Sequence, residues 1–89
     1  MPTIHLLVKG KVQGVFFRAS AKEKAVHLGI SGWVRNTGEG HVEVLATGNE
    51  EQLAAFIDWC RKGPDKARVT DVDITEKPLE MIIGFRIIR

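Results

Sequence analysis

The fold is decided near the start of the chain by residues 3–28, which read TIHLLVKGKVQGVFFRASAKEKAVHL. Up to residue 12, apolar and polar side chains alternate, and only Leu7 is out of step. The apolar face of this segment consists of Ile4, Leu6, Val8 and Val12. A period of two residues predicts a half-buried strand over residues 3–12.

From residue 19 to residue 28 the period changes, because Ala21, Ala25 and Leu28 recur at helical spacing. This pattern predicts a helix over residues 19–28. Gly29 follows as a C-terminal stop, since glycine adopts the left-handed conformation at little cost. The chain therefore passes from a strand to a helix through a short loop.

This loop contains Gly14 and ends at Arg18, and it predicts an anion-binding cradle. Backbone N–H groups of such a loop can turn toward one point, and the positive end of the following helix favours an anion there. The forked guanidinium of Arg18 is placed to grip the same anion, for which phosphate or a phosphate ester is the natural occupant. The glycines match neither a Walker loop nor the dinucleotide fingerprint, and a turn that binds nothing is the alternative.

The middle of the chain predicts a hairpin and a second helix. Strands over residues 30–36 and 41–47 flank the link Thr37-Gly38-Glu39-Gly40, which is short enough for a hairpin turn. Asn49 is predicted to cap the second helix, and Gln52 to complete a capping box. The predicted buried face of that helix is Leu53, Phe56, Ile57 and Cys60.

Gly63-Pro64 ends this helix, and residues 69–75 and 82–88 are rich in strand formers, with Glu76-Lys77-Pro78 between them. The order is β-α-β-β-α-β with one extra short strand near the end. It predicts a single α+β domain over residues 1–89: a ferredoxin-like α/β sandwich with two helices on one face of an antiparallel sheet of four to five strands. That fold hosts many activities, so the function must be argued from a site.

Asn36 ends the second predicted strand, although asparagine is depleted in strands and favoured in turns. One interpretation is that it only starts the turn. The other follows from the topology, because the crossover helix makes the first two strands run in the same direction and end at the same edge of the sheet. This places Asn36 near the loop that ends at Arg18, where its carboxamide can hold a water beside the bound anion.

Two segments together resemble the signatures of the acylphosphatase family. The first is Val8-x-Gly10-x-Val12-Gln13-Gly14-Val15-x-Phe17-Arg18, and the second is Gly32-Trp33-Val34-Arg35-Asn36-x-x-x-Gly40-x-Val42, followed by Gly48. Both occur in the family's order and at its spacing. The likeness extends over nearly the whole chain, including Gly63-Pro64 and the closing Gly84-Phe85-Arg86-Ile87.

The resemblance implies a metal-independent acylphosphatase, which hydrolyses the carboxyl–phosphate bond of acyl phosphates to a carboxylate and inorganic phosphate. It implies that Arg18 and Asn36 are catalytic, the first anchoring the phosphoryl oxygens and the second orienting the attacking water. The implied phosphate-binding residues are Gly14, Val15, Phe16, Phe17 and Arg18. The implied partners are a small acyl phosphate and, as a bound anion, inorganic phosphate or sulfate, with no cofactor and no metal.

Composition limits the other functions. A chain of 89 residues builds one core, and a net charge of +2 gives no argument for nucleic acid. The single cysteine, Cys60, excludes an internal disulfide and suits a cytoplasmic protein. No apolar run is long enough to span a membrane. We therefore expect a cytoplasmic monomer that binds neither nucleic acid nor membrane.

Several polar residues have two interpretations. The histidines His5, His27 and His41 show no metal-ligand spacing, so we expect structural or surface roles for them. The basic residues Lys9, Lys11 and Arg35 either raise the positive potential around the loop or form a solvated charged face.

Two other functions stay open at this point. A non-catalytic module that keeps the anion cradle would serve a partner protein, and acylphosphatase-like domains do occur fused to carbamoyl-transfer machinery. A small RNA-binding domain of the same sheet plan requires aromatic side chains on the exposed face of its central strands. The predicted outward residues of those strands, which offer none, are His5, Leu7, Lys9, His41, Glu43 and Leu45.

Overall fold

The computed structural model describes all 89 residues and contains five strands and two helices. In chain order they are β1 (Thr3–Lys11), α1 (Phe17–Leu28), β2 (Ser31–Asn36), β3 (Val42–Thr47), α2 (Glu50–Lys62), β4 (Arg68–Lys77) and β5 (Phe85–Ile88). The predicted order is confirmed, and the extra short strand near the end is β5.

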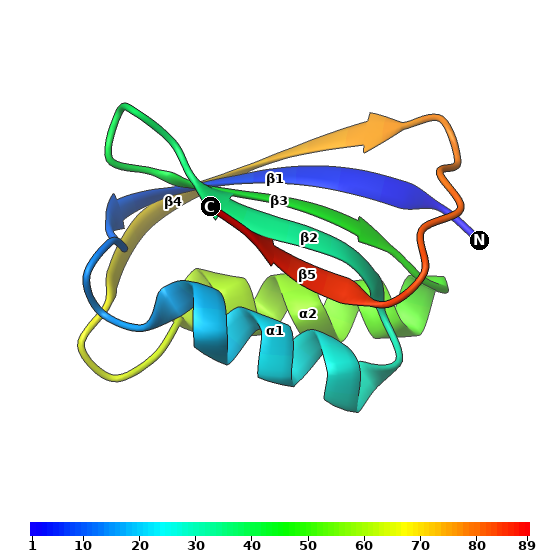
Figure 1. Ribbon diagram of the computed structural model, residues 1–89, viewed down its shortest axis with the longest axis horizontal. Helices are drawn as coiled ribbons and strands as arrows, with labels where there is room; N and C mark the ends of the chain where they lie inside the picture. Colours follow the sequence, from blue (N-terminus) through cyan, green and yellow to red (C-terminus); the bar gives the residue numbers. More distant parts are fainter.

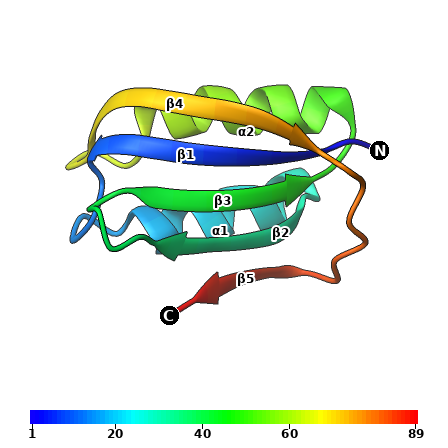
Figure 2. The ribbon, with the colours of Figure 1, turned by 90° about the horizontal axis from the view of Figure 1, so that it is seen from above.

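The strands form one sheet in the order β4-β1-β3-β2-β5, and both helices cover the same face of it (Figures 1 and 2). β1 pairs antiparallel with β3 and β4, and β2 pairs antiparallel with β3. The prediction of an antiparallel sheet is wrong at one edge, because β5 runs parallel to β2. The sheet is therefore mixed.

The parallel edge follows from the path of the chain between β4 and β5, which crosses the end of the sheet from one edge to the other (Figure 2). Two buried threonines hold this crossing. The N–H of Glu80 donates to Oγ1 of Thr3 (3.0 Å), and the hydroxyl of Thr47 donates to the carbonyl of Glu80 (3.1 Å). The two hydroxyl oxygens lie 2.7 Å apart, so the hydroxyl of Thr3 is left to donate to Thr47. The chain then enters β5 at the end of the sheet where β2 begins.

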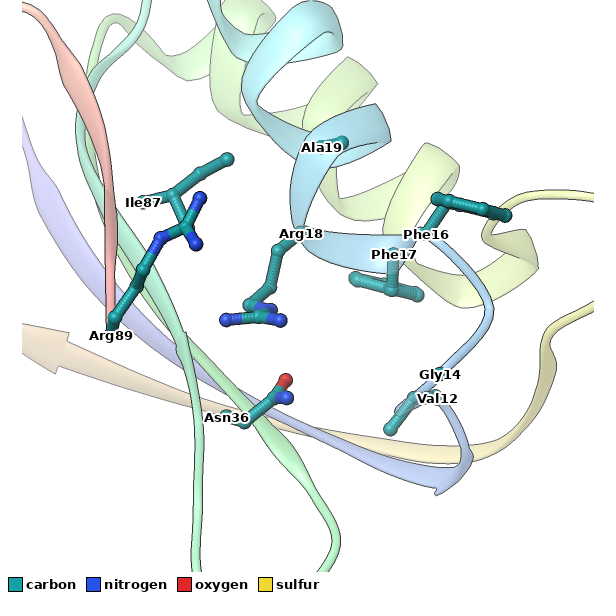
Figure 3. A pocket seen from close by; sticks show the side chains of 9 residues that line it. All are labelled: Val12, Gly14, Phe16, Phe17, Arg18, Ala19, Asn36, Ile87 and Arg89. Carbon is teal, nitrogen blue, oxygen red and sulfur yellow. The ribbon is translucent and has the colours of Figure 1, made fainter.

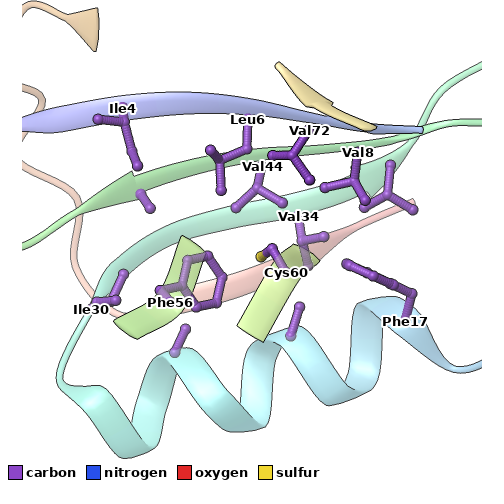
Figure 4. Packing of buried hydrophobic residues seen from close by; sticks show 14 of the residues in the cluster. Ile4, Leu6, Val8, Phe17, Ile30, Val34, Val44, Phe56, Cys60 and Val72 are labelled. Carbon is purple, nitrogen blue, oxygen red and sulfur yellow. The ribbon is translucent and has the colours of Figure 1, made fainter. Parts of the chain in front are cut away.

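The core lies between the sheet and the helices, and Figure 4 shows the strand side chains pointing down onto the two helices. The buried apolar residues include Leu6, Val8, Val34, Val44, Val72, Phe17, Ala21, Ala25, Leu53, Phe56 and Cys60. Trp59 packs against the rings of Phe17 and Phe56, with centroids 5.3 and 6.3 Å apart. Burial raises the pKa of the Cys60 thiol far above its ordinary value, so this cysteine acts as a small hydrophobic core residue, as predicted.

Helix α1 begins at Phe17, two residues before the predicted start. Phe17, Ala21 and Ala25 are buried at a spacing of four residues, so they form one apolar stripe on the helix. Leu28 closes the helix and Gly29 ends it with φ 78°, as predicted. The apolar stripe therefore begins one turn earlier than the alanines alone indicated.

The other face of the sheet is open and carries charged pairs. Burial raises the pKa of Glu43, but hydrogen bonds from His5 (2.6 Å) and Arg35 outweigh it and hold the pKa below its usual value. The guanidinium of Arg35 also covers Trp33, the aromatic side chain of this face, at 5.4 Å from the ring centroid. Lys9 pairs with Asp73 at 2.9 Å. For Lys9 and Arg35, the interpretation as a charged face is therefore the right one.

Neither helix has the length and apolar character needed to cross a membrane.

Candidate anion-binding and catalytic site

One end of the molecule brings together three segments that are far apart in the chain. Figure 1 shows the β1–α1 loop, the β2–β3 hairpin and the C-terminal end of β5 at this end. They enclose a cavity of about 290 Å³. It is lined by Val12, Gly14, Phe16, Phe17, Arg18, Ala19, Asn36, Ile87 and Arg89 (Figure 3).

The predicted cradle residues all lie in the β1–α1 loop or the first turn of α1, but they do not all face the cavity. Gly14, Phe16, Phe17 and Arg18 line it, whereas the side chain of Val15 is buried in the core. Val15 therefore fixes the loop on the core through its side chain.

The backbone of this loop adopts an unusual conformation. Gly14 has φ 74°, and Phe16 has φ 64°, the only positive φ at a residue other than glycine. A left-handed conformation costs a bulky residue roughly 1–2 kcal/mol. Phe16 is 77% exposed, so packing of its side chain does little to offset the cost. Strain of this kind is typical of backbone that is shaped for a ligand.

The amides of the predicted cradle have no acceptor within the protein. None of the hydrogen bonds outside helices and strands, and none of the side-chain hydrogen bonds, is donated by the main chain of residues 14–18. Phe17 and Arg18 lie in the first turn of α1, where an N–H has no partner four residues earlier in the helix. No side chain caps this helix and its first turn has no acidic residue. Five N–H donors and the positive helix end are thus available to an anion.

Asn36 comes to this cavity from β2. It is the last residue of the strand and pairs with Val42 of β3, so it does more than start the turn. Gly32 and Val34 face the helices, and alternation places Asn36 on the same side. Figure 3 shows its carboxamide and the guanidinium of Arg18 pointing toward one another. The Oδ1 atom of Asn36 is buried and has no hydrogen-bond partner in the protein, which makes it ready to accept one from a ligand or water.

Gln13 connects the cradle to the hairpin, and the sequence analysis assigned it no role. Its Nε2 atom donates to the carbonyls of Thr37 and His41, both at 2.9 Å. Thr37 in turn accepts from the N–H of His41 at 3.2 Å through its side-chain oxygen. The two ends of the hairpin turn are therefore held on the cradle loop, beside Asn36. The place of Gln13 within the first signature is the only sequence signal that could have indicated this.

The charge of the cavity is positive. Two guanidinium groups line it, those of Arg18 and Arg89, and no acidic side chain does. Neither arginine forms an ion pair with an acidic side chain. Nowhere in the structure do three or more His, Cys, Asp or Glu side chains gather in a way that could hold a metal ion. Arg89 is a second residue that the sequence analysis did not single out, because nothing local indicates that β5 ends beside β2.

Comparison with known proteins identifies the family of this chain. The sequence profile of the acylphosphatase family matches residues 4–87. The acylphosphatase of Methylococcus capsulatus is 53% identical over 76 residues, which cover 85% of this chain and 83% of that one. The crystal structure of acylphosphatase from Bacillus subtilis has a TM-score of 0.97 at 37% identity, with 100% of both chains covered. An acylphosphatase structure from Coxiella burnetii has a TM-score of 0.93 at 41% identity, covering 97% of this chain and 90% of that one.

The family profile matches nearly the whole chain, relatives are identical at about half of the aligned residues, and solved acylphosphatase structures have the same fold. On these grounds the chain belongs to the acylphosphatase family.

Proposed function

We propose that the cavity hydrolyses acyl phosphates in one step, with the Gly14–Arg18 loop as the phosphate-binding loop and with Arg18 and Asn36 as its catalytic residues. In this proposal the five loop amides and the Arg18 guanidinium bind the phosphoryl oxygens. The free Oδ1 atom of Asn36 accepts a hydrogen bond from the attacking water. Inorganic phosphate, or sulfate in its place, occupies the same cradle.

The observation that carries the proposal is the convergence of free donors and a free acceptor. The main-chain N–H groups of residues 14–18 lack protein partners, and the Oδ1 atom of Asn36 lacks one too. Asn36 and Arg18 line one cavity together with Gly14, Phe16 and Phe17 of the loop. Donors bind the charged phosphoryl group, and an acceptor orients a neutral water molecule, so the cavity offers each reactant the group that it needs.

The chemistry requires little more than this arrangement. The water oxygen forms a bond to phosphorus while the bond between phosphorus and the acyl oxygen breaks, and its electron pair leaves with the carboxylate. The proton of the attacking water passes to a phosphoryl oxygen, which yields inorganic phosphate. A carboxylate leaves without being protonated, and a loose phosphoryl transition state is stabilised mainly by positioning and by opposite charge. The carboxamide of Asn36 neither gains nor loses a proton in this step, so its role is to position the water.

Release of phosphate from acetyl phosphate, with and without EDTA, tests this proposal. We expect turnover that the chelator does not change. Arg18→Ala and Asn36→Ala should each lower kcat/KM by about 100-fold or more, because each removes a group that acts on the transition state. Circular dichroism of both variants checks that they remain folded.

Two outcomes would contradict the proposal in different ways. Turnover that EDTA abolishes would assign the chemistry to a metal ion. Binding of inorganic phosphate without turnover would leave the alternative of an anion-binding module that serves a partner. We further propose that the enzyme works as a cytoplasmic monomer. The single, deeply buried cysteine is compatible with a reducing compartment, and sedimentation analysis tests the oligomeric state.

A further inference from the structure

The wall of the cavity formed by β5 carries a cation that the proposed reaction does not use. Arg89 directly follows β5, level with Asn36 at the end of the neighbouring strand β2. Phe85 is buried and Ile87 packs against the core, so alternation directs Arg89 to the same side of the sheet. Figure 3 shows its side chain extending from the end of β5 beside Ile87 and into the cavity region.

This second guanidinium has no charge partner of its own. No side-chain ion pair includes Arg89, and no acidic side chain lines the cavity. The loop amides and Arg18 already surround the position of the phosphoryl group. Arg89 comes instead from the β5 wall, across the cavity from the loop (Figure 3), and on that side we expect the acyl part of a bound substrate to lie. A cation in that position discriminates between substrates by the charge of their acyl part.

We propose that Arg89 is a specificity-determining residue, which favours acyl phosphates whose acyl part carries a carboxylate of its own. This inference rests on the proposed function, since it concerns the leaving group of that reaction. The cavity volume of about 290 Å³ lies at the lower limit for small-molecule sites and suits a short acyl chain. Ile87 lines the same wall and provides an apolar contact for its methylene groups. A four-carbon dicarboxylate monophosphate fits this description.

The size of the preference follows from the exposure of the side chain. Arg89 is exposed, so water and salt screen its attraction for a carboxylate. An exposed pair of this kind changes an equilibrium by about fivefold. The effect depends on charge alone, in contrast to Arg18, whose planar fork binds two oxygens of one group.

The test compares succinyl phosphate with acetyl phosphate through the ratio of their kcat/KM values. We expect Arg89→Gln to lower this ratio about fivefold and Arg89→Glu to lower it further, because repulsion then replaces attraction. Arg89→Lys should keep most of the ratio, since an ammonium still supplies the charge. Arg86→Gln is the matched control, because Arg86 lies on β5, three residues before Arg89, is exposed and points to the other face. It should leave the ratio as it is.

A binding measurement separates this inference from the proposed function. We expect 3-phosphonopropionate to bind more tightly than propylphosphonate by calorimetry, and Arg89→Gln to abolish the difference. If the enzyme hydrolyses both acyl phosphates but Arg89→Gln leaves the ratio of their kcat/KM values unchanged, the inference about Arg89 is wrong and the proposed function still holds. Binding preference without turnover of either acyl phosphate would overturn the proposed function and leave the charge selection standing. An equal loss for both substrates in Arg89→Gln would also contradict the inference, because Arg89 would then act on the phosphoryl group.

Discussion

The two helices of this protein begin in opposite ways. At the start of α2, the Asn49 side chain accepts from the N–H of Gln52, and the Gln52 side chain accepts from the N–H of Asn49, both at 2.8 Å. Glu50 and Glu51 add negative charge to its first turn. At the start of α1, no side chain caps the helix, no acid is present, and the flanking residue Phe16 has a left-handed backbone. The start of α2 is completed by its own residues, and the start of α1 is left incomplete.

This difference shows how one chain separates stability from function. Free N–H groups at a helix start are normally satisfied by a cap, and such a cap stabilises the protein by about 1 kcal/mol. Helix α2 uses its cap for stability. Helix α1 leaves the same groups open beside Arg18 and so keeps them for a ligand. The following four changes test this contrast, in order of decreasing effect.

The largest effect is expected from Arg18→Lys, which keeps the charge beside the open helix start but removes the planar fork. If the amides and a nearby positive charge sufficed, activity would persist. We expect kcat/KM for acetyl phosphate to fall by about 100-fold, because an ammonium cannot hold two phosphoryl oxygens in the same geometry. Steady-state kinetics measures this, and a loss below fivefold would show that the open amides and a nearby positive charge suffice without the planar fork.

A negative charge at the start of α1 should make it resemble the start of α2. We expect Phe16→Asp to weaken inhibition by inorganic phosphate about tenfold, because the carboxylate competes for the open amides and repels the anion. Val26→Asp is the matched control. Val26 is 60% exposed on the same helix and is far from its first turn. Equal weakening in both variants would mean that only the net charge matters.

Removing the cap of α2 should affect stability and leave the cavity alone. We expect Asn49→Ala to lower the free energy of unfolding by about 1 kcal/mol, which shifts Tm by about 4–8 °C for a chain of this size. Urea and thermal unfolding measure it. The kcat of the folded protein should stay unchanged, since Asn49 lies outside the cavity. A loss of kcat together with the loss of stability would contradict the separation of the two helix starts.

The smallest effect is expected from relieving the strain at the start of α1. Phe16→Gly removes the cost of a left-handed phenylalanine, about 1–2 kcal/mol, but adds flexibility to the unfolded chain. The exposed ring contributes little packing, so we expect a net gain in stability of about 0.5 kcal/mol. Chemical denaturation tests it. A clear loss of stability would mean that the ring makes contacts that its 77% exposure does not suggest.

Much of the fold could be predicted because its signals are local. Alternation in residues 3–12 predicted β1, and the Asn49–Gln52 capping box predicted the start of α2. The partner of β5 could not be predicted, because a short apolar run indicates a strand but not its neighbour. That partner depends on the hydrogen bonds of Glu80 with two threonines that are distant in the sequence.

Topology and resemblance predicted which residues meet at the site, whereas the roles of these residues in binding and catalysis stay predictions. Both led to Arg18 and Asn36 at one end of the sheet, and the structure places them on one cavity. Gln13 and Arg89 were missed because their positions depend on long-range folding, one through contacts with the hairpin and the other through the parallel edge. The conformation of Phe16 has no local signal either, since its residue type disfavours a positive φ.

The double hydrogen bond of Gln13 has a mechanical consequence. Because one side chain donates to carbonyls at both ends of the turn that follows Asn36, it fastens the hairpin to the cradle at this end of the molecule. A fluctuation that widens the loop must carry the neighbouring strand end with it, so the grip on the anion and the placement of the nucleophile are gained or lost together. With phosphate bound in the cradle, local opening should then expose the amides of the hairpin and of the loop to hydrogen exchange at one common rate.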